Sequence, residues 1–457
     1  MSEPTYYPLT QSQLMMFFQM KFCLKKNCTN ICTEIVIQDD EIDQHLLMQA
    51  LYLALMRAPA SSVRLHTQPD KTVVQYFSDA APEKIEYLDF TGKSKEQYDK
   101  ALTTWNQTPF PNKLMDTQLY NVKLLRNPEG KLVVYGCYNH TIYDAYSVMM
   151  TFRDVSEIYY ALRDHTALPA ELPSPVPAYE VDYKYRESDK CKEDYQYFDE
   201  VVCATEPQFT TTNGRNSKEF KQKDPKARYG TYAYNPFFPG DGITLDVPTE
   251  LNNAITAYAL AAKMSPQSAY LLALRSYLAK VCEVDDVLLM NSVARRATLA
   301  QKRAGGTMVN SVPIRTVFGA DKTFEEGCRI LYTTQCDVYR HANHGCGDTL
   351  NLIDKKFNCP KGKTYQSIGT SYQPYFSGSG TIPATFRRMP NGCETQLIYM
   401  TISPRDTFGN MGIDYSYMKN VVSESNIRTV HAFMMRFLEI GIANPQKPIA
   451  EIVEEAL

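Results

Sequence analysis

The sequence predicts an α+β protein built from two lobes, and three observations lead to that prediction. The chain has 457 residues, more than one compact hydrophobic core usually serves. Helix-like and strand-like patterns occur on both sides of a proline-rich break at residues 168–177. Four prolines within that break exclude a helix interior or a central strand, so an extended linker is expected there.

These observations divide the chain into three parts. We expect an N-terminal lobe over residues 1–173, a proline-rich linker over 174–190 and a C-terminal lobe over 191–457. Helices and antiparallel-looking strands recur in both lobes, and no short internal repeat is visible.

In the N-terminal half, hydrophobic periodicity and turn residues predict each element in order. Thr10 is a suitable N-cap for a helix with an apolar face, and Pro59 ends the helix at 42–56. A turn that contains Pro128 and Gly130 separates the strands expected at 119–125 and 131–138, which predicts a hairpin. The expected strands are 31–37, 63–65, 72–77, 119–125 and 131–138, and a further helix spans 148–162.

The C-terminal half gives a similar alternation. Ser265 followed by Pro266 is a strong helix start. The expected helices are 182–202, 248–263, 265–281 and 426–442, and the expected strands are 243–247, 287–293, 308–315, 396–402 and 412–417. Gly-rich and Asn-rich composition predicts loops or bent strands at 341–363 and 371–395, and an exposed loop at 210–226.

Composition excludes several classes of function. The net charge of -3 favours neither nucleic acid nor an anionic membrane as a partner. No apolar run approaches the ~20 residues that span a bilayer, and the first residues do not resemble a signal peptide. The 12 cysteines are scattered, and their spacing fits no metal site. We therefore expect a cytoplasmic monomer with reduced thiols.

The most informative stretch is residues 138–147, which join an apolar strand to a helix. His140 lies where the strand ends, and Asp144 follows four residues later. Regular structure on both sides can hold a catalytic base rigidly at such a junction. The alternative is a buried structural histidine followed by an N-cap aspartate, and these residues alone leave both interpretations open.

Several motifs occur in an order that resembles the condensation domain of nonribosomal peptide synthetases, within the chloramphenicol-acetyltransferase-like acyltransferases. That family has a His-His-x-x-x-Asp-Gly motif, which is similar to residues 139–145 here. Residues 9–16 resemble its opening motif, and Arg57 and Arg64 lie near its early pair of arginines. Residues 306–315, preceded by Arg295-Arg296, resemble its Asn-containing strand. The resemblance covers nearly the whole chain.

The resemblance implies a fold and an activity. The fold would be two chloramphenicol-acetyltransferase-like lobes in a V-shaped pseudo-dimer with a central channel. The activity would be amide formation between a carrier-bound acyl or peptidyl thioester and an amine, with His140 as the catalytic residue. Substrates would arrive on phosphopantetheine or coenzyme A, from carrier proteins or neighbouring synthetase modules, with no cofactor bound to the chain itself.

The resemblance also suggests roles for the residues around His140. Asp144 is expected to form a structural ion pair, with Arg64 as its first-choice partner and Arg295 as the alternative. Ser147 is expected to cap the following helix, with lining the channel as its alternative. Asn310 has two interpretations, a hydrogen-bonding group in the channel or a structural residue at a strand end.

Two positions depart from the family pattern. Asn139 replaces the first histidine, and an amide cannot accept and hold a proton near neutral pH. Ala145 replaces a glycine, which is compatible with the motif if the backbone keeps a negative φ. Both changes bear on rate and substrate range more than on fold.

Two other functions remain open. One is an acyltransferase that uses acyl-coenzyme A and a small amine or alcohol. The other is a non-catalytic scaffold or recruitment module, which a filled channel around His140 would favour. A cyclisation-type relative is not expected because its Asp-rich motif is missing, and the sequence does not separate epimerisation from condensation.

Overall fold

The elements of the N-terminal half largely follow the hydrophobic pattern of the sequence. The computed structural model describes residues 4–231, 235–373 and 380–457. The first helix begins in a capping box, in which the Thr10 side chain and the Gln13 side chain each bond the other's backbone N–H. The elements up to the linker are β1 (Tyr7–Pro8), α1 (Gln11–Phe22), β2 (Asn30–Ile37), α2 (Gln44–Arg57), α3 (Pro59–Ser62), β3 (Val63–Thr67), β4 (Val73–Phe77), β5 (Glu86–Asp89), α4 (Lys95–Gln107), η1 (Pro111–Leu114), β6 (Tyr120–Arg126), β7 (Leu132–Asn139) and α5 (Ala145–Arg163).

The remaining elements build the second half. Ser265 is the N-cap of the helix that begins at Pro266, as the sequence predicts. The elements are α6 (Val176–Arg186), α7 (Asp189–Tyr197), η2 (Phe198–Val202), β8 (Gly230–Thr231), β9 (Gly240–Asp246), α8 (Thr249–Ala261), α9 (Pro266–Cys282), β10 (Asp286–Val293), α10 (Leu299–Arg303), β11 (Asn310–Val317), α11 (Phe324–Arg340), α12 (Cys346–Lys356), β12 (Lys363–Thr364), β13 (Ile368–Tyr372), β14 (Ala384–Met389), β15 (Ile398–Pro404), β16 (Met411–Met418), α13 (Glu424–Ala443) and α14 (Ile449–Ala456).

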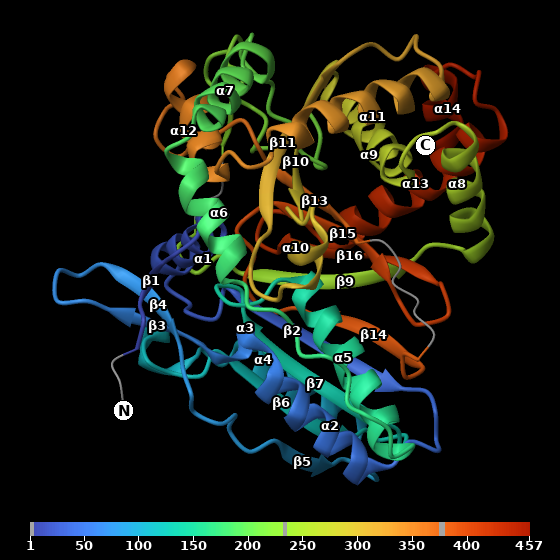
Figure 1. Cartoon of the computed structure of the whole chain (residues 1–457). Coiled ribbons are helices and arrows are strands. Elements are labelled where there is room, and N and C mark those ends of the chain that lie inside the picture. Colours follow the sequence, from blue (N-terminus) through green and yellow to red (C-terminus); the bar gives the residue numbers. More distant parts are fainter. Residues whose placement is uncertain (1–3, 232–234, 374–379) are drawn as a thin grey trace.

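Two large β-sheets form the centres of two lobes (Figure 1). The N-terminal lobe has a five-stranded sheet in the order β14-β2-β7-β6-β5, and the C-terminal lobe has a six-stranded sheet in the order β11-β10-β13-β15-β16-β9. A small sheet, β1-β4-β3, flanks the first lobe. The strands are not all antiparallel as predicted, because β5 runs parallel to β6 and β13 runs parallel to both β10 and β15.

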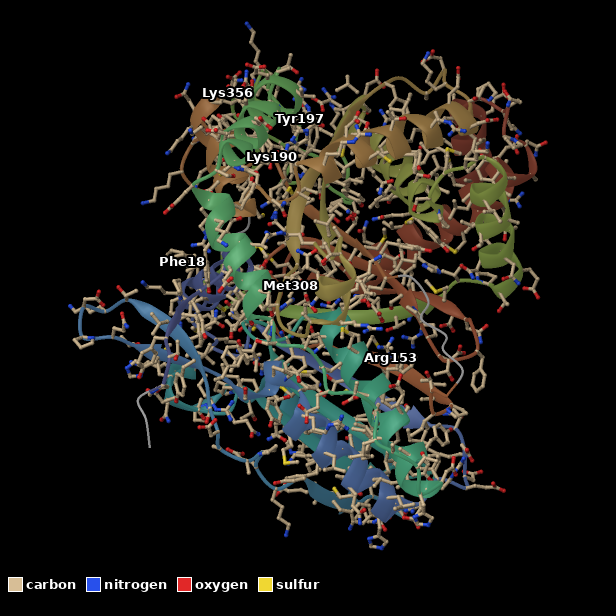
Figure 2. The ribbon with its side chains drawn as sticks, in the orientation of Figure 1. Phe18, Arg153, Lys190, Tyr197, Met308 and Lys356 are labelled. Atoms are coloured by element: carbon tan, nitrogen blue, oxygen red, sulfur yellow. The ribbon has the colours of Figure 1, made fainter. Side chains whose placement is uncertain are left out.

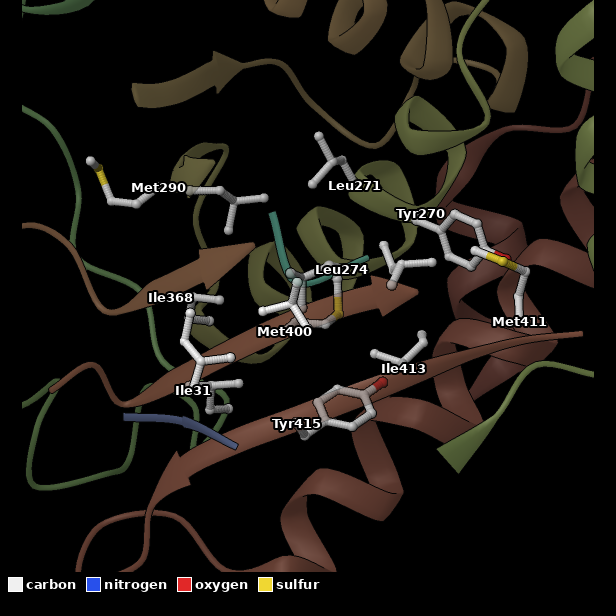
Figure 3. Packing of buried hydrophobic residues seen from close by; sticks show 14 of the residues in the cluster. Ile31, Tyr270, Leu271, Leu274, Met290, Ile368, Met400, Met411, Ile413 and Tyr415 are labelled. Carbon is white, nitrogen blue, oxygen red and sulfur yellow. The ribbon is translucent and has the colours of Figure 1, made fainter. Parts of the chain in front are cut away.

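Helices cover the sheets and bury a shared core. In the N-terminal lobe, α2 packs on α5, and α4 packs against β2. In the C-terminal lobe, α9 packs against α11, α13 and α14, and its residues Tyr270 and Leu274 lie in one cluster with Met400 and Tyr415 (Figure 3). Ile31 of β2 belongs to the same continuous cluster. The two lobes therefore share one hydrophobic core.

One strand crosses between the lobes. The chain leaves the C-terminal sheet after β13, and β14 then pairs antiparallel with β2, with Ala384 opposite Ile37 and Met389 opposite Cys32. Figure 1 shows β14, in orange, beside the blue and cyan strands of the first lobe. Local patterns predict only loops or bent strands at 371–395. Residues 374–379 of that range lie outside the described residues.

The linker is partly helical rather than extended. Residues 168–175 carry no helix, in agreement with their prolines, but α6 begins at Val176 within the expected linker 174–190. Pro177 is tolerated because the first turn of a helix leaves its N–H groups without intrahelical partners. A second correction concerns 341–363, where α12 occupies part of a predicted loop.

Candidate functional site

A cavity of about 190 Å³ lies between the lobes and contains His140. Its wall from the N-terminal lobe includes residues of β2 and of the start of α5. Its wall from the C-terminal lobe includes residues of β10, β13 and β15, and the crossing strand β14 adds more. The lining includes Ile31, Thr33, Glu34, Ile35, His140, Asp144, Ala145, Val148, Met149, Ser292, Arg296, Ser371, Phe386, Arg387, Arg388, Tyr399, Thr401, Arg405 and Asp414.

Backbone contacts on two sides hold His140 at the end of β7. Its N–H donates to the Thr29 carbonyl at 2.8 Å, and its carbonyl accepts a hydrogen bond of 2.6 Å from the Thr307 hydroxyl. Thr29 precedes β2, whereas Thr307 comes from the C-terminal lobe. The histidine backbone is thus fixed by both lobes at once.

The His140 ring is mostly enclosed but open to the cavity. Its Nδ1 atom is buried and has no hydrogen-bond partner in the described part of the chain. The Nε2 edge is therefore the polar part of the ring that can face a substrate. Burial lowers the pKa of His140 below 6.5, although the negative charge of Asp144 opposes that shift. The imidazole is held in its neutral form, which a general base requires.

Asp144 is the N-cap of α5 and is fully satisfied. Its Oδ1 accepts from the backbone N–H and the hydroxyl of Ser147, both at 2.9 Å, and its Oδ2 accepts from the Met308 N–H at 3.0 Å. Burial by itself would raise the pKa of Asp144, but the charge and hydrogen bonds of Arg296 and these donors lower it below 3.8. The described hydrogen bonds of the carboxylate go to Ser147, Met308 and Arg296 and not to the His140 ring.

The ion-pair partner of Asp144 is Arg296, so the predictions of Arg64 and Arg295 are wrong. Arg296 donates to both carboxylate oxygens, at 2.7 and 3.1 Å, and the pair is buried. Arg64 instead donates to the carbonyls of Ser61 and Val63 beside the small sheet.

Arg295 points in the opposite direction from its neighbour. Its guanidinium pairs with Asp182 of α6 at 2.9 Å. Its backbone has a φ of 51°, in the left-handed region that non-glycine residues rarely adopt. That turn of the backbone directs the next residue, Arg296, inward to the motif.

The two departures from the family motif have different structural roles. Asn139 is fully buried, and its side chain accepts from the N–H and hydroxyl of Thr141 and donates to the Thr29 hydroxyl. It shapes the turn that carries His140. Ala145 is the first residue of α5 and has no positive φ, so its methyl group introduces no backbone strain, and it lines the cavity.

Ser147 and Asn310 are structural residues. Asp144, not Ser147, caps α5, while the Ser147 hydroxyl lies 2.7 Å from the Gly306 carbonyl and does not line the cavity. Asn310 donates to the carbonyls of Ala342 and His344 and accepts from the N–H of Cys346. This agrees with the strand-end interpretation and not with a role in the channel.

The segment 304–308 closes over the motif from the C-terminal lobe; the family resemblance includes its residues 306–308, but the sequence did not predict these contacts. Its Gly306 carbonyl accepts from Arg296 and Ser147, Thr307 holds His140, and Met308 donates to Asp144. Met308 lies where the lobes meet (Figure 2). The available signal is Gly305-Gly306, a pair that marks irregular backbone but names no contact.

A comparison with family models finds a match, which covers almost the full length of this chain. The model of the condensation domain matches residues 3–455. The chain belongs to the condensation domain family. Surfactin synthase subunit 1 of Bacillus subtilis (strain 168) is 21% identical over 98% of this chain, and a plipastatin synthase subunit of the same organism is 21% identical over 99%. This condensation domain spans only 12% and 17% of the length of those two relatives.

Solved structures share the fold of this condensation domain. The first condensation domain of the calcium-dependent antibiotic synthetase, solved with a substrate analogue, has a TM-score of 0.81 at 17% identity, covering 98% of this chain and 99% of its own. The starter condensation domain of rhizomide synthetase, solved with C8-CoA, has a TM-score of 0.79 at 18% identity, covering 97% and 96%. The expected fold of two chloramphenicol-acetyltransferase-like lobes is confirmed.

Family membership also gives the enzyme class. Condensation domains are acyltransferases that form amide bonds in nonribosomal peptide synthesis, and this places the chain among the transferases. Within the described residues, no group of three His, Cys, Asp or Glu side chains is arranged to hold a metal. No helix of the described chain has the length and apolar character needed to cross a bilayer.

Proposed function

We propose that this condensation domain joins a carrier-bound acyl or peptidyl thioester to an amine, with His140 as the catalytic residue. The observation that carries the proposal is the position of His140, whose ring lies open in a cavity that both lobes line. Two substrates entering such a cavity would meet at one imidazole, and this positioning alone is a large contribution to rate.

The chemistry requires few groups. The amine nitrogen attacks the thioester carbonyl, the C–N bond forms and the C–S bond breaks. The neutral His140 takes or directs the proton that the amine loses, and that proton then goes to the departing thiolate. A thioester is already activated, so no serine or cysteine nucleophile is needed.

The surrounding network supports a positioning role for Asp144 and Arg296. Both side chains are buried, and a carboxylate paired with arginine has little tendency to exchange protons. Their pairing anchors the start of α5 to the segment 304–308. Because that segment also bonds the His140 carbonyl, the pair fixes the histidine relative to both lobes.

An exposed apolar and basic surface supports a carrier protein as the donor partner. Phe22 of α1 is 69% exposed, and Leu24 and Phe237 beside it are 57% and 50% exposed. The Leu24 N–H donates to the Pro236 carbonyl, which joins the two segments. Exposed Lys21 lies among these residues, and Phe18 lies on the same helix (Figure 2). Exposed apolar residues with a lysine among them suit an acidic protein domain.

We call these residues the α1 surface: Phe18, Lys21, Phe22, Leu24 and Phe237. A short stretch of chain connects this surface to the backbone that holds His140. The chain runs from Leu24 to Thr29, whose carbonyl accepts from the His140 N–H. A carrier bound there would lie next to the loop that holds the catalytic turn.

The test is amide formation from defined substrates. Purified protein is supplied with an acyl group on a carrier domain, on pantetheine or on coenzyme A, together with an amine acceptor, and amide product is measured by mass spectrometry. We expect product with the carrier-bound donor, and loss of that preference over pantetheine in Phe22→Glu. Faster turnover with acyl-coenzyme A than with the carrier would favour the acyl-coenzyme A function, and no product from any donor would favour a scaffold.

A further inference from the structure

The crossing strand places an arginine inside the channel. Alternate residues of a strand point to opposite faces, so Phe386 and Arg388 share one face of β14. Their partners on β2 are Ile35 and Thr33, and all four line the cavity. Arg387 belongs to the other face, where it pairs with Glu34 and Asp99.

Arg388 contacts the opposite lobe but has no acidic partner. Its Nη1 donates to the Thr401 hydroxyl at 2.8 Å, and its guanidinium lies 5.6 Å from the centre of the Tyr399 ring. No carboxylate of the described residues lies within 4.0 Å of it. By contrast, each of the three other arginines that line the cavity has one: Arg296 pairs with Asp144, Arg387 pairs with Glu34, and Arg405 lies 3.5 Å from Asp414.

The charge of Arg388 acts on the Glu394 carboxylate and partly offsets the rise in pKa that burial causes there, but that carboxylate is hydrogen-bonded elsewhere. Its Oε1 accepts from the backbone N–H groups of Thr395 and Gln396, and it forms no ion pair with Arg388. Burial raises the pKa of Glu394, which reduces its ability to balance a cation. Among the described residues, Arg388 therefore presents to the cavity a positive charge that no carboxylate pairs with directly.

The wall opposite Arg388 carries a row of polar side chains. The strand register places one residue from each of the six strands side by side: Ser311, Ser292, Ser371, Thr401, Asp414 and Thr244. The neighbouring Asn291 bonds Gln267 and Tyr339 of the covering helices, so Ser292 and its row point the other way, into the channel. The Ser292 hydroxyl also lies 2.7 Å from the Tyr399 hydroxyl.

The rest of the N-terminal wall is largely apolar. Ile31, Ile35, Val148, Met149 and Phe386 line it. Arg388 is half-buried in the cavity wall, and Thr401 takes one of its guanidinium hydrogen bonds, so other N–H groups of the same side chain can donate to a bound anion. Hydroxyl groups across the channel supply further donors to the same anion.

We propose that Arg388, with the serine and threonine hydroxyls of the row opposite, binds a carboxylate on the substrate, so that the channel selects an acidic acyl or aminoacyl group. This inference rests on the proposed function, because it assigns the substrate class of the same site. In a thioester-tethered amino acid the α-carboxyl group is consumed by the thioester. The recognised carboxylate is then that of an aspartyl-like or glutamyl-like side chain.

The experiment measures binding and not turnover, so that it stands apart from the test of the proposed function. The probes are unreactive thioether analogues of aspartyl-pantetheine and asparaginyl-pantetheine, which match in shape and differ in charge. Calorimetric titration of the wild type should give at least ~10-fold tighter binding of the aspartyl analogue, a typical difference for a charge-assisted hydrogen bond. In Arg388→Gln the preference should vanish, and in Arg388→Lys it should be partly retained.

A matched control removes a cation elsewhere. Arg153→Gln neutralises an exposed arginine on the outside of α5 (Figure 2) and should keep the wild-type preference. Free asparagine, whose only carboxylate is the α-carboxylate, separates the two sources of that group. Binding of free asparagine that depends on Arg388 would mean that an untethered amino acid is the ligand. Equal binding of both analogues by the wild type, or an unchanged preference in Arg388→Gln, would overturn the proposal.

Discussion

His140 is the single side chain on which the proposed chemistry depends. Replacing it with alanine removes the proton acceptor that the turn after β7 places in the cavity, so amide formation should fall by ~10²–10⁴-fold. The measurement is product formation under saturating donor and acceptor, with circular dichroism to establish that the variant is folded. A folded His140→Ala protein with wild-type turnover would exclude the catalytic role.

The pH dependence of the reaction should carry the signature of a buried imidazole. Burial lowers the pKa of His140 below 6.5, and only the neutral ring accepts a proton. Activity should therefore be present above that lowered pKa and be lost as the pH falls through it, with a midpoint below 6.5.

The acceptor amine also titrates, so kcat/KM is measured with two acceptors whose amine pKa values differ. The limb that stays fixed between the two acceptors belongs to the enzyme. A fixed limb with its midpoint above 6.5 would contradict the assignment.

The ion pair of Asp144 with Arg296 should be strongly coupled. Asp144→Asn leaves the Arg296 charge buried without a counter-charge, which costs about 3–5 kcal/mol of unfolding free energy, and turnover should fall with it. In the double variant with Arg296→Gln the two losses should be far from additive. Chemical denaturation of the single and double variants measures this.

Arg64 provides the matched comparison. It is buried, and its hydrogen bonds to the described residues go to the backbone carbonyls of Ser61 and Val63, so the effects of Arg64→Ala and Asp144→Asn should add. Coupling of Asp144 to Arg64 instead of Arg296 would contradict the structure. A stable Asp144→Asn protein without turnover would give Asp144 a role in the chemistry.

At the residue scale, the sequence predicted the positions that depend only on neighbouring residues in the chain. His140 at a strand end and an aspartate at a helix start follow from residues 138–147 alone. The partner of Asp144 could not be found in that way, because it lies more than 150 positions away. Arg295 and Arg296 are adjacent residues of the same type, and the sequence does not show which one faces the motif; in the structure the backbone at Arg295 is left-handed, and Arg296 is the one that pairs with Asp144.

At the scale of elements, the segment 304–308 should control the placement of His140. Thr307→Val keeps the volume of the side chain but leaves the His140 carbonyl without its donor, which should lower the unfolding free energy by about 1–2 kcal/mol. We also expect kcat to fall more than KM rises, because the histidine shifts and the rest of the cavity remains. Thr307→Ser, which keeps the hydroxyl, should restore kcat, and equal rates for the valine and serine variants would contradict this role.

Most helices and strands could be predicted because they carry their own signals, such as the capped start of α1 and the hairpin of β6 and β7. The exception that matters is β14. It is a short strand in a stretch rich in Gly, Ser and Pro, and its partner β2 lies about 350 positions earlier in the chain. Strand pairing at such a separation leaves no local pattern, so the strand that brings Arg388 into the channel was not predicted as such.

At the scale of the whole molecule, sequence reasoning predicted two lobes and placed the break between them near residue 173. It did not predict that the lobes share a strand and a core. Ile382 and Ala384 come from the second half of the chain, yet they are fully buried in the cluster that also contains Ile35 and Leu47. The lobes should therefore depend on each other for stability.

This dependence can be tested on the first lobe alone. In a fragment of residues 1–173, β2 would lose the partner that pairs with Cys32 to Ile37 and become an exposed edge strand, which is prone to association with other chains. The fragment should be aggregated or should lack a cooperative thermal transition, whereas the full chain should melt in one transition. Size-exclusion chromatography and circular dichroism of the two proteins measure this. A monomeric fragment with its own cooperative melt would show that β14 is dispensable and that the first lobe is an independent domain.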